Sequence, residues 1–189
     1  MEVFEQDIKR CVESMTLGGT FLYPTDTIWG IGCLAEDDAA VARVFEIKQR
    51  PQYKSLIVLM SDVRMLRRYL ASPLPDLETF VEQFSKPTSI IYSNAIGLAS
   101  QAIADDGTVG VRITSDPFCK ALIKRIQKPI ISTSANVSGE LTPSSYEDIS
   151  SAITNEVDYV VKWRQEERIE AQASSVIRLQ DDGSFETLR

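Results

Sequence analysis

The run Leu56–Met60 constrains the fold most, because all five of its residues are apolar. A strand with one face in water alternates apolar and polar residues, whereas a strand covered on both faces is apolar throughout. Amphipathic helical patterns stand on either side of this run, at residues 37–48 and from Asp62 to about Tyr69. Strands that alternate with helices predict an α/β domain with a mixed, twisted sheet flanked by helices.

The remaining expected elements continue this alternation. Helices are expected at 3–15, from Asp76 toward Phe84, from Asp116 to about 126 and from Ser144 or Ser145 to about Ile153; strands are expected at 20–23, 88–92, 108–113, 129–131, 159–161, 174–179 and 185–188. Residues 165–171 are polar and predict a mobile loop before the final hairpin. The sequence has no repeat and no low-complexity linker, so residues 1–189 are expected to form one domain.

The chain contains no histidine. This excludes a Ser-His-Asp site, a His-ligated zinc and a histidine general base. Its cysteines, Cys11, Cys33 and Cys119, are far apart and predict neither a disulfide framework nor a thiolate metal cage. Chemistry in this chain must therefore rest on positioning and charge, or on a substrate and metal that supply the reactivity themselves.

The net charge of −7 argues against tight non-specific nucleic-acid binding, which depends on a basic surface. A small anionic ligand remains compatible with this balance if basic residues gather locally. The longest apolar runs are too short to cross a bilayer, and Glu2, Glu5 and Asp7 are unlike the start of a secretory signal. We expect a cytoplasmic protein without membrane contact.

Hydroxyl, amide and glycine residues gather at 132–139, directly after the apolar run 129–131. Hydroxyl side chains compete with the backbone for hydrogen bonds, so this cluster is expected to end the strand and form a loop. At the open end of a strand, such a loop can hold a polar ligand. Taken alone, the segment is better explained as an ordinary turn.

A second polar cluster, residues 23–32, leaves a strand through Pro24 and presents two threonines and an aspartate. Gly30 and Gly32 allow close approach of the backbone to a neighbour. The alternative is a turn that carries a core tryptophan, Trp29, and we would favour it if the segment stood alone.

Basic residues provide the third signal. Lys48, Arg50 and Lys54 lead into the buried strand, where they can grip a phosphate or carboxylate or simply face solvent at a helix end. Arg112 stands inside the apolar segment 109–113, so it must reach solvent at the strand end or bind an anion. A structural salt bridge explains Arg112 equally well.

Together these motifs resemble the YrdC/Sua5 family, the threonylcarbamoyl-AMP synthases. The resemblance rests on YPTDTIWGIG at 23–32, KQRP at 48–51, GVRI at 110–113 and STSANVSG at 132–139, in the family's order and approximate spacing. The segment 173–177 is similar to the family's closing strand. The resemblance covers nearly the whole chain, which lacks the extra C-terminal domain of longer Sua5 proteins and so resembles the short, single-domain form.

The resemblance implies a twisted α/β sheet around a concave, basic cavity. It also implies an enzyme that makes L-threonylcarbamoyl-AMP and pyrophosphate from L-threonine, bicarbonate and ATP. Mg²⁺ would arrive with ATP, without a metal site of the protein's own. The product would pass to downstream proteins that transfer the threonylcarbamoyl group to tRNA, and a weak or transient contact with tRNA is compatible with this role.

Site residues follow from the family's motifs by position. Threonine would be held by Thr27, Arg112 and Ser132, with Arg112 on its carboxylate. Lys48 and Arg50 would be the catalytic pair on the phosphates. The nucleotide would be lined by Lys48, Arg50, Lys54, Thr108, Ser134, Asn136 and Thr142. Two departures bear on the phosphate contacts: Lys54-Ser55-Leu56 replaces Asn-Pro-Leu, and the segment 85–89 replaces PGPxT.

Two other functions fit parts of the sequence. The YciO-like branch shares the fold but departs from the synthase motifs; the retained KQR and SAN favour a synthase, while the altered PGPxT faintly favours YciO. A non-catalytic RNA-binding module is the other alternative, and the acidic balance of the chain argues against it.

Overall fold

The computed structural model describes residues 3–51, 55–168, 174–180 and 182–188, so the loop expected at 165–171 lies partly outside the described residues. Its helices are α1 (Glu5–Thr16), α2 (Asp38–Ile47), α3 (Val63–Arg67), α4 (Leu77–Glu82), α5 (Pro117–Ile126), α6 (Ser151–Thr154) and the 3₁₀ turn η1 (Ser100–Ala102). Its strands are β1 (Phe21–Tyr23), β2 (Gly30–Gly32), β3 (Ile57–Met60), β4 (Thr88–Tyr92), β5 (Val109–Ile113), β6 (Ile130–Ser134), β7 (Tyr159–Val160), β8 (Ser175–Leu179) and β9 (Phe185–Thr187).

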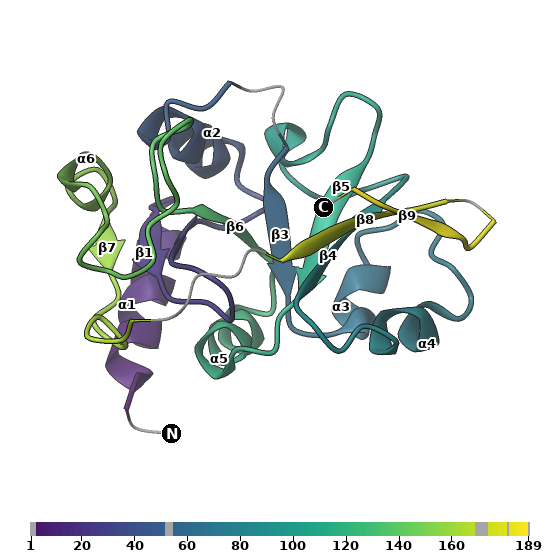
Figure 1. Ribbon diagram of the computed structural model, residues 1–189, viewed down its shortest axis with the longest axis horizontal. Helices are drawn as coiled ribbons and strands as arrows, with labels where there is room; N and C mark the ends of the chain where they lie inside the picture. Colours follow the sequence, from purple (N-terminus) through teal and green to yellow (C-terminus); the bar gives the residue numbers. More distant parts are fainter. Residues whose placement is uncertain (1–2, 52–54, 169–173, 181, 189) are drawn as a thin grey trace.

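The strands join in one mixed sheet, in the order β7-β1-β2-β6-β3-β5-β4-β8-β9 (Figure 1). The pairs β3–β5, β4–β8 and β1–β7 are parallel, and the other pairs are antiparallel. Helices surround the sheet, which confirms the expected α/β class. Strand β3 lies between β5 and β6, and its consecutive residues 58–60 are all buried, so both of its faces are covered, which explains why its sequence is apolar throughout.

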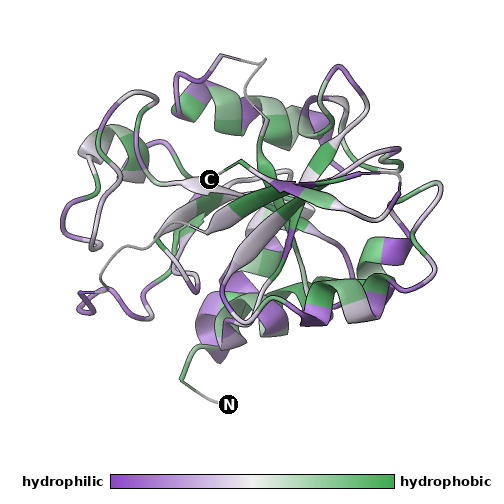
Figure 2. Ribbon diagram, turned by 45° about the vertical axis from the view of Figure 1, so that its right-hand side comes forward, coloured by the Kyte–Doolittle hydropathy of each residue, from purple (hydrophilic) through white to green (hydrophobic). Residues whose placement is uncertain are grey.

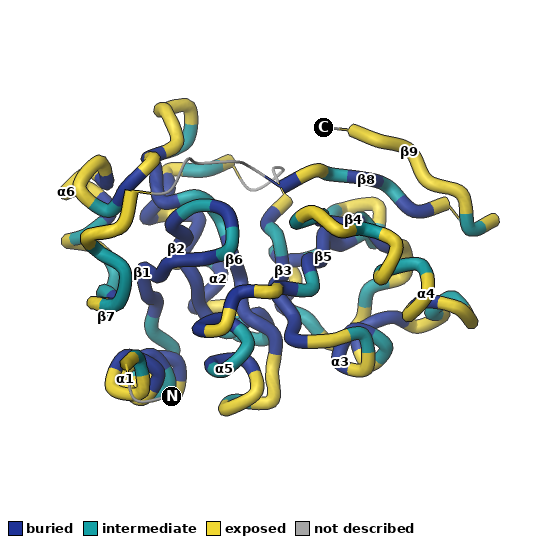
Figure 3. Tube along the Cα trace, turned by 60° about the horizontal axis from the view of Figure 1, so that its bottom comes forward, coloured by how far each residue is buried: buried dark blue, intermediate teal, exposed yellow. Residues whose placement is uncertain are grey.

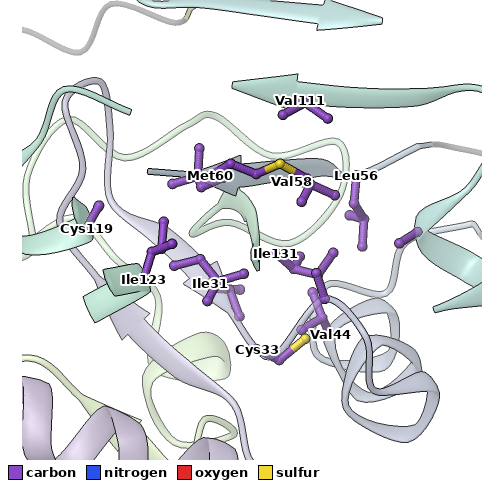
Figure 4. Packing of buried hydrophobic residues seen from close by; sticks show 14 of the residues in the cluster. Ile31, Cys33, Val44, Leu56, Val58, Met60, Val111, Cys119, Ile123 and Ile131 are labelled. Atoms are coloured by element: carbon purple, nitrogen blue, oxygen red, sulfur yellow. The ribbon is translucent and has the colours of Figure 1, made fainter. Parts of the chain in front are cut away.

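Alternate residues of the central strands build the core. Val58 and Met60 of β3 are buried beside Ile131 of β6, and Val58 pairs directly with Ile131 (Figure 4). Helices α2 and α5 contribute Val44 and Ile123 to the same cluster. Because successive side chains of a strand point to opposite faces, the residues between these core residues lie on the other face of the sheet.

Aspartates stand at the start of four helices, as their sequence positions predict, and three of them cap the helix with the side chain; Asp76, before α4, makes no such bond. Asp37 accepts a hydrogen bond from Ala40 N at 3.0 Å, and Asp62 accepts one from Met65 N at 2.9 Å. Asp116 caps α5 in the same way, with Pro117 at the first helical position. Each cap satisfies a backbone N–H that has no partner inside its helix.

The structure corrects three expectations. Strand β6 continues through Ser134 rather than ending at residue 131. The strands β2 and β3 on either side supply its backbone partners, and this pairing outweighs the tendency of hydroxyl side chains to bond to the local backbone. The short strand β2 was not expected, since its two glycines resemble a turn. The helix expected from Ser144 or Ser145 begins only at Ser151, because both earlier hydroxyls bond to Asp148 in a turn.

Burial follows the sheet order. The strands at the centre are buried, whereas β9 at the edge is exposed (Figure 3). Hydrophobic residues predominate in the central strands, whereas the helices combine hydrophobic and hydrophilic residues (Figure 2). Cys11, Cys33 and Cys119 are free and buried. Within the described ranges, no helix combines the length and the apolar character that crossing a membrane requires.

Candidate functional site

One face of the sheet carries a polar cavity of about 210 Å³. Its floor comes from adjacent strands, because Gly30 pairs with Ser134 and Ile57 pairs with Ser132. The two-residue period of β6 directs both serines to this face, away from the core side of Ile131. Gly30 leaves the space next to Ser132 open, because a Cβ at this position would lie 3.2 Å from the Ser132 hydroxyl oxygen.

Six of the predicted site residues converge on this cavity. The lining consists of Thr27, Ile28, Gly30, Arg50, Ser55, Leu56, Ile57, Arg112, Ser132, Thr133, Ser134, Thr142 and Ser174. The described lining contains two arginines and no carboxylate, which suits an anionic ligand. Three predicted residues, Lys48, Thr108 and Asn136, are not part of the lining, and Lys54 lies outside the described residues.

Arg112 reaches the cavity from β5 and also pairs with a buried acid. Its Nη2 lies 3.1 Å from Oδ1 of Asp26, and the two side chains are 6% and 10% exposed. The Nε of Arg112 is buried without a hydrogen-bond partner among the described residues. The salt bridge and a ligand role are therefore compatible, because the salt bridge does not use the Nε–H of the guanidinium.

A hydroxyl pair fixes the loop between β1 and β2. Thr25 Oγ1 lies 3.0 Å from Thr27 Oγ1, and it accepts the Thr27 backbone N–H at 3.1 Å. Thr25 and Thr27 are both buried. The Thr27 hydroxyl is thereby held at the cavity wall by its own loop.

Lys48 is buried and is not part of the cavity wall. Its side chain is 1% exposed, and Nζ donates hydrogen bonds to the backbone oxygens of Ser134 and, at 2.7 Å, Asn136. The Lys48 carbonyl accepts the Ser138 N–H at 2.8 Å. Burial, with a smaller contribution from the charge of Arg50, lowers the pKa of Lys48 to about 7. Lys48 therefore shapes the polar loop after β6.

Asn136 closes that same loop. Its Nδ2 donates to the carbonyls of Val137 and Glu140 at 3.0 and 2.8 Å. Its Oδ1 is buried and, within the described chain, accepts no hydrogen bond. A buried acceptor of this kind is suited to a hydrogen-bond donor from a ligand.

Arg50 and Thr108 differ in their relation to the cavity. Arg50 lies on the wall, and its Nη2 donates to the Ser55 carbonyl at 2.8 Å. Its burial lowers the pKa of Arg50 from the usual value, a shift that leaves the guanidinium charged. Thr108 instead donates to Asp106 at 2.6 Å at the start of β5.

Sequence reasoning missed Ser174 and Ser55 as lining residues. Ser174 is buried on the wall, and its hydroxyl lies 3.0 Å from that of Ser89. Ser89 is the last residue of the segment that replaces PGPxT, so this segment contacts a residue of the cavity wall through a hydroxyl. The sequence feature that could have indicated Ser174 is the similarity of residues 173–177 to the family's closing strand.

The fold and the site define an α/β domain with a cation-lined polar cavity on one face of its sheet. The family model of the Sua5, YciO and YrdC proteins, described as telomere recombination, matches residues 13–189. The chain belongs to this family, as the motifs predict.

Two curated relatives have similar lengths. A threonylcarbamoyl-AMP synthase of Pseudoalteromonas translucida (strain TAC 125) is 31% identical over 160 residues, covering 83% of this chain and 86% of that protein. A threonylcarbamoyl-AMP synthase of Xanthomonas euvesicatoria is 32% identical over 158 residues, covering 82% and 84%.

Solved structures share the fold. P. abyssi Sua5 complexed with L-threonine superposes with a TM-score of 0.84 at 24% identity, over 98% of this chain and 54% of that one. E. coli YciO superposes with a TM-score of 0.83 at 24% identity, over 97% of this chain and 88% of that one. Both branches of the family therefore have the same architecture.

Proposed function

We propose that this protein is an L-threonylcarbamoyl-AMP synthase, a nucleotidyltransferase that uses L-threonine, bicarbonate and ATP. The observation that carries the proposal is the convergence of Thr27, Arg50, Arg112, Ser132 and Ser134 on one cavity. The family relationship to proteins named threonylcarbamoyl-AMP synthase supports it.

Threonine would occupy the inner part of the cavity. The unpartnered Nε of Arg112 would donate to its carboxylate, while Thr27 and Ser132 supply hydroxyls for the remaining polar atoms. Ile28 and Ile57 give the same wall an apolar portion, which suits the threonine methyl group. The cavity is smaller than the roughly 300–1,000 Å³ that encloses a drug-sized ligand, so it suits the amino-acid end of the reacting complex.

The chemistry requires alignment rather than a protein nucleophile. The threonine amine and bicarbonate give a carbamate with loss of water. A carbamate oxygen then bonds to the α-phosphorus of ATP, and the bond from that phosphorus to the bridging oxygen breaks to release pyrophosphate. Such a transfer depends on positioning and on neutralising charge, which explains how a chain without histidine could catalyse it.

The nucleotide would enter from the rim. Arg50 and the Ser134 side of the cavity would face the phosphates, and exposed Thr142 would lie beside the nucleotide. Lys48 would act by holding the end of β6 at Ser134 and the loop that follows it, which carries Asn136. Arginine suits the phosphate role because its planar guanidinium makes two-pronged contacts.

Magnesium would belong to the substrate, as MgATP. Within the described residues, no group of three or more carboxylates or thiolates stands close enough to hold a metal ion. Mg²⁺ commonly keeps several waters and binds substrate phosphates through few protein ligands, so this donor set fits a metal delivered by ATP. The labile product would go to cytoplasmic proteins that transfer the threonylcarbamoyl group to tRNA.

The test is pyrophosphate release from MgATP and bicarbonate by the purified protein, with and without L-threonine. We expect release only when L-threonine is present. Binding of ATP without threonine-dependent release would favour the YciO-like alternative. A salt-sensitive complex with tRNA and no ATP turnover would favour the RNA-binding module.

A further inference from the structure

A short segment after β7, residues 161–168, packs against the core; we call it the strap. The buried carboxylate of Asp7 accepts the backbone N–H groups of Lys162 and Trp163, at 3.1 and 3.0 Å. The Trp163 ring lies 4.8 Å from that of Phe4, between centroids. Asp7 of α1 and the neighbouring Phe4 thus fix the start of the strap.

Arg164 projects from the strap into a partly buried position. Its Nη1 donates to Asp116 Oδ2 at 2.9 Å and to the Thr25 carbonyl at 3.3 Å, and its Nε donates to Glu167 at 2.5 Å. The side chain is 15% exposed, and Asp116 is 2% exposed. Arg164 adopts a φ of +67°, which is uncommon for a residue other than glycine. Its contacts outweigh this backbone cost, since the conformation persists only where the surroundings determine it.

The Thr25 carbonyl connects Arg164 to the predicted threonine site. Thr25 is the residue whose hydroxyl contacts the hydroxyl and backbone N–H of Thr27. Arg164 also forms an ion pair with Asp116. The backbone N–H of Asp116 donates to Thr114 Oγ1 at 3.2 Å. Thr114 and Ser115 in turn donate to Asp26, the partner of Arg112.

We propose that Arg164 is a positioning residue for threonine recognition: it holds the Thr25 carbonyl and Asp116 so that Thr27 and Arg112 face the cavity together. The inference rests on the proposed synthase function, because it assigns threonine to that wall of the cavity. Arg164 does not line the cavity, so it would act through Thr27 and Arg112 and not by touching substrate.

The experiment measures KM for L-threonine and for ATP, and threonine affinity by calorimetry, in Arg164→Ala. Loss of a charge-assisted contact that orients a site residue predicts a rise of about tenfold in KM for threonine, with less than about a twofold change in KM for ATP. Arg164→Lys is expected to recover part of the threonine affinity, since an ammonium group can replace one of the two Nη1 contacts.

Two further variants separate positioning from folding. Arg164→Gly removes the side chain but suits the positive φ, so it keeps the test available if the alanine variant folds poorly. Arg168→Ala is the matched control: the same strap loses an arginine whose partner, Glu147, lies at the surface, with side chains 84% and 70% exposed. The control is expected to keep both KM values.

The outcomes are distinct. Equal rises in both KM values, or none in Arg164→Ala and Arg164→Gly, would overturn the positioning role. A selective loss of threonine affinity that lysine partly restores supports it. If the unmodified protein releases no pyrophosphate with threonine present and binds no threonine by calorimetry, the proposed function fails, and this inference fails with it for that separate reason.

Discussion

Arg112 Nη2 lies 3.1 Å from Asp26 Oδ1, in a setting where both side chains are almost fully buried. This relationship joins folding to substrate recognition. Removing only the arginine would leave the buried Asp26 carboxylate without this charged partner. A second acid, Asp116, has a pKa that is raised chiefly by burial and also by the charge of Asp26. Substitution of Arg112 alone therefore affects stability as well as ligand binding.

A double-mutant cycle separates these effects. Arg112→Met is expected to lower the free energy of unfolding by on the order of 3 kcal/mol, because a buried ion pair that loses one partner leaves an uncompensated charge. Adding Asp26→Asn is expected to restore most of this stability without restoring threonine use. Urea unfolding and KM for threonine measure the two quantities. Full recovery of threonine use in the double variant would show that Arg112 serves the fold alone.

Lys48 gives a pH-dependent prediction. Its pKa is about 7 in the folded protein, against 10.5 for an exposed lysine. Between these values the unfolded chain binds more protons, so the contribution of Lys48 makes the free energy of unfolding rise with pH from about 7 toward 10. Lys48→Met is expected to remove that part of the rise, and urea unfolding at pH 7 and pH 9 measures it. Equal pH dependence in both proteins would contradict the lowered pKa.

Arg50 is expected to affect the nucleotide without affecting the fold. It is half-buried on the cavity wall, and Arg50→Ala is expected to raise KM for MgATP by about tenfold through loss of a charge-assisted phosphate contact. Arg43→Ala provides a matched control, because Arg43 pairs with Glu46 and Glu156 on the exposed side of α2. Unchanged ATP kinetics in Arg50→Ala would remove this residue from the phosphate site.

Much of the fold followed from the sequence because its signals are local. Apolar runs, aspartate caps and Pro117 located the helices and strands, and Asp37 and Asp116 cap as expected. The extension of β6 through Ser134 could not be read locally, since it depends on pairing with β2, which is itself too short and glycine-rich to stand out. Pairing between strands that are distant in sequence determined both the length of β6 and the formation of β2.

In the site, too, local motifs identified some residues, while others depend on long-range contacts. The motifs brought Arg50, Arg112 and Ser132 to one cavity, as predicted. No local pattern indicated that Lys48 is buried and donates to the Asn136 carbonyl, since a lysine next to a helix end usually lies in solvent. The contact from Arg164 to the Thr25 carbonyl spans 139 residues and lies outside every motif. Such long-range contacts require the folded structure.

The most direct measurement of the central claim follows the atoms of both small substrates into one product. The protein is incubated with MgATP, ¹³C-bicarbonate and ¹⁵N-L-threonine, and the nucleotide fraction is analysed at once by mass spectrometry. We expect an AMP adduct that carries both labels, formed together with pyrophosphate and absent when threonine is omitted. Pyrophosphate formation without a doubly labelled adduct, or no product from protein that binds both substrates, would contradict it.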